Sequence, residues 1–223
     1  MTFSVEIFRD MMHTISVGLK VPTTIVLLLF VAITVVELGS LLVETITERR
    51  RMKAKVPELL NALQGKDAGG LMEEINKSGL LGRQKAALAE LSAHFHLPVA
   101  TLQALARRLL SSEELHYTKK TALTDLVARL GSMFGLMATL IPLGPGLIAL
   151  GQGDTKTLAD SLLTAFDATV TGLATASVCF AISRLRKRWY EDYLVSMETL
   201  MEGILEEVGS HERGIKAKQT QEA

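Results

Sequence analysis

Three long apolar stretches, each with at most one charged residue, separate the polar parts of this chain. The first runs from Val21 to Val36 and continues to Val43 if Glu37 is tolerated; the second runs from Leu130 to Leu150. The third, from Ser161 to Ser183, carries only Asp167. A helix needs about 20 residues to cross the apolar core of a bilayer. Each stretch has spanning length, and so much apolar surface in a short chain favours three transmembrane helices over buried helices of a soluble protein.

The segments between and after these spans also show helical patterns. Glycine, proline and short polar residues predict breaks at Gly65 to Gly70, at Ser78-Gly79 and near Pro98. Since Leu115 to Leu130 contains neither proline nor glycine, the last of these helices is predicted to run directly into the second span. After the third span, apolar residues alternate steps of four and three, the seam of a helix that packs on other helices. They are Tyr190, Leu194, Met197, Met201, Ile204 and Val208. Gly209 and the polar run after it are predicted to end this helix.

Lysine and arginine residues give the predicted orientation. They gather after the first span, before the second and after the third, whereas the opposite ends hold only Arg9, Lys20 and Lys156. Such residues mark the cytoplasmic side of a membrane protein. The N-terminus is therefore expected outside and the C-terminus in the cytoplasm, with the chain in the plasma membrane.

The fold class predicted from these patterns is an all-α, polytopic membrane protein with three transmembrane helices and a helical cytoplasmic domain. The expected division is an extracytoplasmic segment (1–20), the first transmembrane helix (21–46), a cytoplasmic helical insertion (47–124), the second transmembrane helix (125–151), the third transmembrane helix (158–184), a cytoplasmic C-terminal helix (185–210) and a flexible tail (211–223).

Composition and motifs exclude several classes of function. The 24 basic and 24 acidic residues balance, which gives no case for nucleic-acid binding. The single cysteine, Cys179, has no partner for a disulfide or a metal-thiolate site and is interpreted as a packing residue. His94 and His96 are two residues apart, so on a helix they point in different directions and make a poor metal pair. With no nucleotide-binding loop or known catalytic motif, we expect neither an enzyme nor a cofactor.

Small and hydroxyl residues recur at helical spacing along the third span, among them Thr164, Asp167 and Thr171. Such residues favour close helix contact in lipid, which explains most of the pattern. Asp167 stands out because a carboxylate near mid-bilayer costs about 2.5–3.5 kcal/mol and usually faces a cavity, a partner or an ion path. Two interpretations of Asp167 remain open, a pore or partner role and a structural hydrogen bond between helices. Glu37, near the cytoplasmic end of its span, is expected to reach the headgroups or pair with a neighbouring helix.

The second span contains Pro142 and Pro145 among glycines. Proline frees a backbone carbonyl and permits a bend in a transmembrane helix, so the sequence predicts a bend or hinge here.

Two runs resemble signatures of a known family. Gly135 to Thr139, Gly-Leu-Met-Ala-Thr, resembles the Gly-Leu-x-Gly-Thr signature of TolQ and ExbB. Ala165 to Leu173, Ala-Phe-Asp-Ala-Thr-Val-Thr-Gly-Leu, is similar to their Ala-Leu-x-Ala-Thr-x-x-Gly-Leu in the following span. Order and spacing match over about Leu126 to Trp189, and the three-span layout is that of TolQ and ExbB. The chain is therefore identified as a member of the MotA/TolQ/ExbB family. It departs from the pattern in Ala138, which replaces a glycine, and in two additions, the Pro142-Leu143-Gly144-Pro145 turn and Asp167.

The resemblance implies a proton channel or stator subunit, with Thr139 and Thr169 at the positions of pore-lining threonines. We group Asp167 and Thr171 with these two threonines as candidate residues of the pore or ion path. It further implies a homopentamer around two copies of a single-span partner like ExbD, TolR or MotB, whose membrane aspartate carries the proton, and a role in ion or protein transport. Two alternatives remain: a non-conducting membrane scaffold that holds a partner and cytoplasmic proteins, and a small solute transporter. The transporter ranks last because inverted repeats and paired broken helices are not evident.

Overall fold

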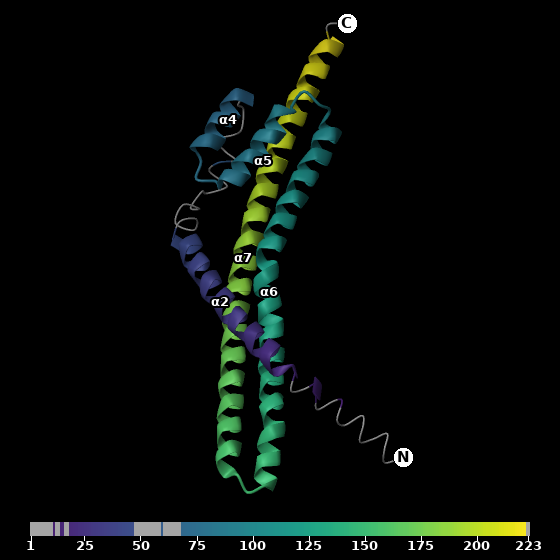
Figure 1. Cartoon of the computed structure of the whole chain (residues 1–223). Helices are drawn as coiled ribbons and strands as arrows, with labels where there is room; N and C mark the ends of the chain where they lie inside the picture. The colour runs from purple at the N-terminus through teal and green to yellow at the C-terminus, as the bar shows by residue number, and fades with distance from the viewer. Residues whose placement is uncertain (1–10, 12–13, 16–17, 47–58, 60–67, 222–223) are drawn as a thin grey trace, which may run out of the picture. The chain divides into compact units, whose positions relative to one another are not determined.

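The computed structural model describes residues 11, 14–15, 18–46, 59 and 68–221, and every element in this part of the chain is helical. The helices are α2 (Lys20–Glu44), α4 (Ala68–Lys77), α5 (Gly82–Ala93), α6 (Val99–Gly151) and α7 (Thr155–Gln221) (Figure 1). Of these, α2, α6 and α7 contain stretches long and apolar enough to cross a membrane. The prediction of an all-α, polytopic membrane protein is confirmed.

The helix breaks follow the sequence pattern closely. α4 ends at Lys77, before Ser78, and α6 begins at Val99, where the Pro98 carbonyl accepts a 2.9 Å hydrogen bond from the Thr101 amide. α6 then continues without interruption into the second span, as predicted. The break expected at Gly65 to Gly70 lies partly outside the described residues, and its last part belongs to α4.

The end predicted for the last helix is wrong. α7 continues through Gly209 to Gln221. A glycine inside a helix costs only about 1 kcal/mol, and the residues that follow are mostly good helix formers such as glutamate, arginine, lysine, alanine and glutamine. The flexibility expected for the tail stays a prediction.

The chain divides into two compact units, which we call the first unit (residues 1–41 and 121–185) and the second unit (residues 42–120 and 186–223). In the first unit, α2 packs on the antiparallel α6–α7 pair through a core of Phe30, Val127 and Cys179. The Phe30 and Phe134 rings meet edge to face with centroids 5.7 Å apart. Cys179 is fully buried, in agreement with its interpretation as a packing residue.

The other face of α2 is exposed and almost wholly apolar. Its large hydrophobic side chains are Val21, Ile25, Leu28, Leu29, Val35, Val36, Leu38, Leu42 and Val43. A continuous apolar surface of this kind is unfavourable in water and is the surface expected of a helix that faces lipid tails.

The second unit is a small helical bundle. Its core combines apolar residues of α4, α5, α6 and α7, and its fully buried members are Ile75, Leu88, Leu91, Leu102, Met197, Leu200 and Ile204. The apolar seam predicted after the third span therefore packs on other helices. At the edge of this core Arg83 donates two hydrogen bonds to Glu113, of 3.0 and 2.9 Å, which raise the pKa of the Arg83 guanidinium against a smaller opposing effect of burial.

A tight turn joins α6 to α7. Gly153 has φ 78°, a left-handed conformation that glycine adopts without strain. Asp154 then caps α7: its carboxylate accepts hydrogen bonds from the amide of Thr157 (3.0 Å) and from the Thr157 hydroxyl (2.5 Å). These bonds stabilise the charged form and lower the pKa of Asp154.

Candidate functional site

The two runs of the second and third spans that resemble the family signatures meet at glycines. A Cβ atom on Gly172 of α7 would lie 2.6 Å from the Cα of Gly135 and 2.8 Å from the carbonyl oxygen of Gly131, both on α6. These distances are shorter than any real Cβ contact, so α6 and α7 touch backbone to backbone here. Small residues allow this close approach in membranes, where packing replaces the hydrophobic effect as the force between helices.

Thr139 and Thr169 lie at one level of this antiparallel pair. Thr139 follows Gly135 by about one turn, and Thr169 precedes Gly172 by nearly one turn. Because the helices run in opposite directions, both threonines lie on the hairpin side of the Gly135–Gly172 contact. The structure thus brings together, at one height, the two residues that the family resemblance assigns to the pore.

Both hydroxyls donate to their own helix. Thr139 Oγ1 bonds to the Leu136 carbonyl at 2.6 Å, and Thr169 Oγ1 bonds to the Ala165 carbonyl at 3.0 Å. A hydroxyl that donates its proton in this way keeps lone pairs that can accept another hydrogen bond. Each threonine can therefore accept a hydrogen bond from water or a protonated carboxyl without bringing a fixed charge into the membrane.

Asp167 lies on another side of α7. Successive helical residues are about 100° apart, so Asp167 and Thr169 project roughly 160° apart around the helix axis. The Asp167 side chain is exposed, and it makes no hydrogen bond or ion pair with the described residues. Within one chain, the Asp167 and Thr169 side chains therefore lie on nearly opposite sides of α7 and cannot line the same path.

Thr171 belongs to a third environment. Together with Thr164 it lines a groove of about 210 Å³ between α7, α6 and the start of α2, where Thr23 and Thr24 form part of the wall. Pro142 lines the same groove. The four residues predicted for one ion path thus occupy a shared level (Thr139, Thr169), a groove (Thr171) and an exposed face (Asp167).

The two prolines lie inside α6, which continues as a helix through both. Pro142 is buried and Pro145 is exposed. The bend expected at these positions stays a prediction.

A polar contact inside the first unit was not predicted. Thr34 of α2 donates to the Phe30 carbonyl at 2.7 Å, and its Oγ1 lies 3.2 Å from Cys179 Sγ of α7. Both side chains are buried. Glu37, about one turn further along α2, is partly buried. Its expected contact with the headgroups or with a neighbouring helix stays a prediction.

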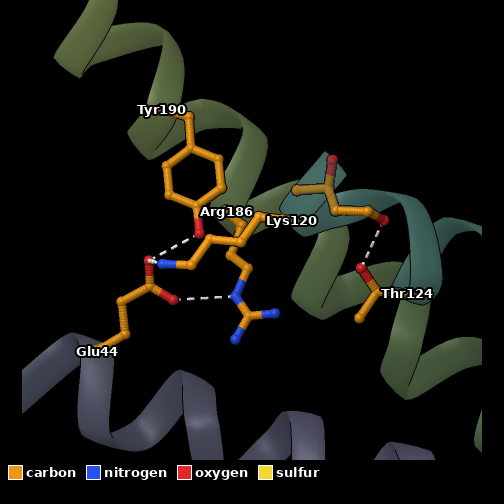
Figure 2. A network of polar contacts seen from close by, with 6 residues as sticks. Glu44, Lys120, Thr124, Arg186 and Tyr190 are labelled. Atoms are coloured by element: carbon orange, nitrogen blue, oxygen red, sulfur yellow. Dashed lines mark hydrogen bonds and ion pairs between the residues drawn. The ribbon is translucent and has the colours of Figure 1, made fainter. Parts of the chain in front are cut away.

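A second polar network, in the second unit, was also missed (Figure 2). The Glu44 carboxylate, at the end of α2, accepts hydrogen bonds from Arg186 Nε at 3.0 Å and from the Tyr190 hydroxyl at 2.8 Å. Lys120 Nζ lies 3.8 Å from the same carboxylate, and the Tyr190 ring stacks on Tyr117 with centroids 4.4 Å apart. The side chains of Glu44 and Arg186 are only 7% and 3% exposed, so the ion pair is buried and the loss of either charge is costly.

The sequence held a signal for Glu44. Buried residues of α2 recur at steps of three, four or seven, which keep to one side of a helix, and Glu44 continues this series: Thr23, Leu27, Phe30, Thr34, Leu41 and Glu44. A carboxylate on the packing stripe of a helix indicates a buried partner. That the partner is Arg186, 142 positions away, is not visible in any local pattern.

The chain matches the model of a known protein family. The model of the MotA/TolQ/ExbB proton channel family matches residues 83–199, slightly more than half of the chain. The chain belongs to the MotA/TolQ/ExbB proton channel family. The match extends beyond the region of the sequence resemblance on both sides, from α5 through all of α6 and into the second-unit part of α7.

The family match leaves out α2 and Glu44 but includes Arg186. A comparison with curated proteins gave no match. The MotA/TolQ/ExbB family consists of proton channels and is not an enzyme class. Among the described residues no group of three or more histidine, cysteine or acidic side chains is placed to hold a metal ion.

Proposed function

We propose that this chain is the proton-channel subunit of a motor-type complex, which couples a proton gradient to movement of a single-span membrane partner. The observation that carries the proposal is the family match over both α6 and α7, together with the placement of Thr139 and Thr169 at one level beside the Gly135–Gly172 contact. Two neutral hydroxyls from neighbouring helices at one height suit a path for protons.

In the proposed mechanism the partner supplies the titrating group. A partner carboxyl in a low-dielectric site has a raised pKa and exchanges a proton readily. Because Thr139 and Thr169 already donate to backbone carbonyls, their oxygens are free to accept from the protonated carboxyl or from water. The threonines thus guide the proton without titrating themselves, and the chain requires its partner for function.

Asp167 has a separate role in this proposal. A carboxylate exposed on a membrane-crossing helix, without a partner among the residues that the structure describes, is unfavourable against lipid. We assign it to a contact with the single-span partner or with another copy of this chain, on a different side of α7 from Thr169. Thr171, in the groove beside α2, lies off the direct Thr139–Thr169 path.

The assembly proposed is a homopentamer around a dimer of an ExbD-, TolR- or MotB-like partner in the plasma membrane. The N-terminus is placed outside and the C-terminus in the cytoplasm, following the distribution of lysine and arginine. The second unit is then cytoplasmic, and the α6–α7 turn faces the outside. This orientation and the domain limits given above stay proposals.

The test is proton flux into liposomes that contain this chain with its single-span partner. Thr139→Val and Thr169→Val keep the side-chain shape and remove the hydroxyl, so each should lower partner-dependent flux while expression and oligomer size stay normal. Thr24→Val is the matched control, because Thr24 is an exposed threonine of α2 whose hydroxyl also donates to its own helix, at 2.9 Å to Lys20. It should leave the flux unchanged.

Asp167→Asn separates the two interpretations of this residue. The amide keeps the size of the side chain but cannot ionise, so a functional Asp167 predicts reduced flux with intact oligomers. Unchanged flux in both threonine variants, again with intact oligomers, would refute the pore assignment. The non-conducting scaffold would then become the leading function.

A further inference from the structure

An open groove in the first unit lies between α2, α6 and α7, and its volume is about 210 Å³. Along α2 its wall consists of residues on one side of the helix, Lys20, Thr23, Thr24, Leu27 and Leu28. Leu28 is 64% exposed, so the groove opens onto the apolar face of α2, which is expected to meet lipid tails. The groove therefore borders the hydrocarbon of a membrane.

A contact between α2 and α7 shows how the two walls are aligned. Thr34 of α2 and Cys179 of α7 mark one level, since their side-chain atoms Oγ1 and Sγ are 3.2 Å apart. The groove residues precede this level on both helices, so α2 and α7 run in the same direction here. Lys20 lies 14 residues before Thr34, and Thr164 lies 15 residues before Cys179. Lys20 and Thr164 are therefore at nearly the same height, at one end of the groove.

The inside of the groove suits an apolar occupant. Apart from Lys20 and the threonines, its lining residues are apolar: Leu27, Leu28, Ala138, Ile141, Pro142 and Ala168. The hydroxyls of Thr23, Thr24 and Thr164 donate to carbonyls of their own helices, at 2.6, 2.9 and 2.9 Å. A hydroxyl that has donated its proton offers no donor to a ligand. Of the wall hydroxyls only that of Thr171, at the end far from Lys20, makes no hydrogen bond with the described residues.

The size of the groove selects among apolar occupants. Its volume lies below the roughly 300–1,000 Å³ of pockets for drug-sized molecules. A helix with its side chains is about 10 Å wide, so a helix of another protein chain does not fit into the groove. From Lys20 to Leu28 the groove follows α2 for about 12 Å. A single extended acyl chain has the narrow, elongated shape that these dimensions require.

Two charges of opposite sign stand at one end of the groove. Lys20 lines it and directly precedes the uncharged stretch of α2. Asp160 lies one turn before Thr164 on the same side of α7, and it directly precedes the apolar stretch of the third span. Both side chains are exposed, and neither makes an ion pair or a hydrogen bond with the described residues. Lys20 and Asp160 therefore lie where a membrane passes from hydrocarbon to headgroups.

Lys156 is a further charged residue on this side of α7, one turn before Asp160. It is exposed, and no ion pair joins it to Asp160 in the structure. A basic residue four positions before an acidic one is the less favourable order for such a pair. Along the helix Lys156 lies about 12 Å from the level of Thr164 and Lys20. Asp160 is therefore the charge nearest to Lys20 on this side of α7.

The two charges select the headgroup. A phosphate pairs with the ammonium of a lysine, and a primary ammonium pairs with a carboxylate. Phosphatidylethanolamine carries a phosphate and a primary ammonium next to each other. A purely anionic headgroup would place its negative charge near Asp160 without a cation, and the nitrogen of a choline headgroup has no N–H to donate.

We propose that this groove binds one molecule of a phospholipid with an ethanolamine headgroup. One acyl chain lies in the groove, the phosphate pairs with Lys20, and the ammonium pairs with Asp160. The inference goes beyond the proposed function and does not depend on it, because Thr139 and Thr169 do not line the groove.

Native mass spectrometry of delipidated oligomers tests the site. Dioleoyl phosphatidylethanolamine, dioleoyl phosphatidylcholine or dioleoyl phosphatidylglycerol is added back in detergent, and the lipid bound per chain is counted. We expect one molecule of the ethanolamine lipid per chain, with an affinity about fivefold higher than that of the other two lipids. Equal binding of the three lipids would overturn the proposal.

Single charge changes test the two ion pairs. Lys20→Gln should lower the affinity for the ethanolamine lipid about fivefold, the usual effect of one lysine at a charged lipid surface. Lys156→Gln is the matched control and should leave the affinity unchanged; an equal loss in both would show general surface attraction and contradict the site. Asp160→Asn should bring the ethanolamine and choline lipids to the same affinity. A preference for ethanolamine that survives Asp160→Asn would overturn the pairing with the ammonium.

Filling the groove tests where the acyl chain lies. Ala168→Leu narrows the groove from α7 and should abolish lipid retention. Ala174→Leu, on an exposed side of α7 outside the groove, is the control and should retain the lipid. The oligomer mass shows whether each variant assembles, and Thr24→Trp fills the groove from α2 if Ala168→Leu does not. Lipid retained in the assembled, filled variants would place it elsewhere and refute the groove.

Photolabelling separates a bound lipid from the surrounding bilayer and from a protein occupant. In vesicles of the ethanolamine lipid, an analogue with a diazirine in its acyl chain should label α2 at Leu27 and Leu28 much more than at Val35 and Val36. The latter two are 65% and 69% exposed but do not line the groove. Even labelling along α2 would indicate bulk lipid. A bis-maleimide product that joins Leu28→Cys to a second chain or to the single-span partner would show that protein covers the groove. Either result would overturn the proposal.

Discussion

Gly172 and Gly135 touch so closely that a Cβ atom on Gly172 would lie 2.6 Å from the Cα of Gly135. The contact leaves no flexible side chain that could move aside, because the nearest atoms all belong to backbone. It sets the separation of α6 and α7 at the level next to Thr139 and Thr169. The position of each hydroxyl therefore depends on a glycine, without a side chain, three or four residues away on the same helix.

Gly172→Ala should push α6 and α7 apart. Overpacking of this kind costs about 1–3 kcal/mol in the free energy of unfolding, and proton flux should fall because the threonine level is displaced. Thermal unfolding in detergent measures the first effect and liposome flux the second. Gly144→Ala is the control, since a Cβ there meets no atom within 4 Å. It should be neutral or stabilising by up to about 1 kcal/mol. Equal behaviour of the two variants would contradict the contact.

Glu44→Gln should strongly destabilise the protein. The amide keeps a hydrogen-bond acceptor for Tyr190 but removes the Glu44 charge from beside the buried Arg186 cation, at a cost of about 3 kcal/mol or more. The exposed pair of Glu73 and Lys77, with side chains 67% and 65% exposed, provides the control. Glu73→Gln should change the free energy of unfolding by less than about 0.5 kcal/mol. Chemical unfolding in detergent compares them, and similar losses would show that the Glu44 pair is not buried.

Thr157→Val should raise the pKa of Asp154. The Thr157 hydroxyl is the largest cause of the lowered pKa, while its backbone amide would remain as a donor, so the pKa should move only part of the way to its unfolded value of 3.8. The pKa of Asp154 is lower in the folded than in the unfolded protein. At a pH above the unfolded pKa, the charged cap therefore gives its full stabilisation to the start of α7. This stabilisation is lost as the pH falls through the folded pKa. NMR titration of labelled aspartate measures this shift. Thr155→Val, a neighbouring exposed threonine, should leave the pKa of Asp154 unchanged.

Cysteine accessibility should place the α6–α7 turn and the second unit on opposite sides of the membrane. In a Cys179→Ser background, Lys156→Cys in the start of α7 should react with a membrane-impermeant maleimide from outside. Glu114→Cys in the second unit should react only after the membrane is opened. Both positions are exposed in the structure. Reversed labelling would invert the proposed orientation.

Features that depend on local sequence were predicted well. The three spans follow from run length and charge, and the breaks at Ser78 and Pro98 follow from residues that end helices. The extension of α7 past Gly209 was missed because a single glycine is a weak signal when helix formers surround it.

Features that depend on distant contacts were not predicted. Asp167 and Thr169 were predicted to share an ion path because both are polar, but their side chains project in nearly opposite directions around the α7 axis. The partner of Glu44 required knowledge of which helices meet, since Arg186 lies 142 positions away. The same applies to Thr34 and Cys179, which are 145 positions apart.

The Glu44–Arg186 pair has a consequence for exchanging parts between relatives. The family match begins after α2, yet the matched region contains a buried cation whose counter-charge α2 supplies. A chimera that receives its first helix from another protein should lose stability unless the donor helix carries an acidic residue at the position of Glu44 or Arg186 is replaced along with it. Glu44 and Arg186 should therefore be exchanged together, and the first helix is not an interchangeable membrane anchor.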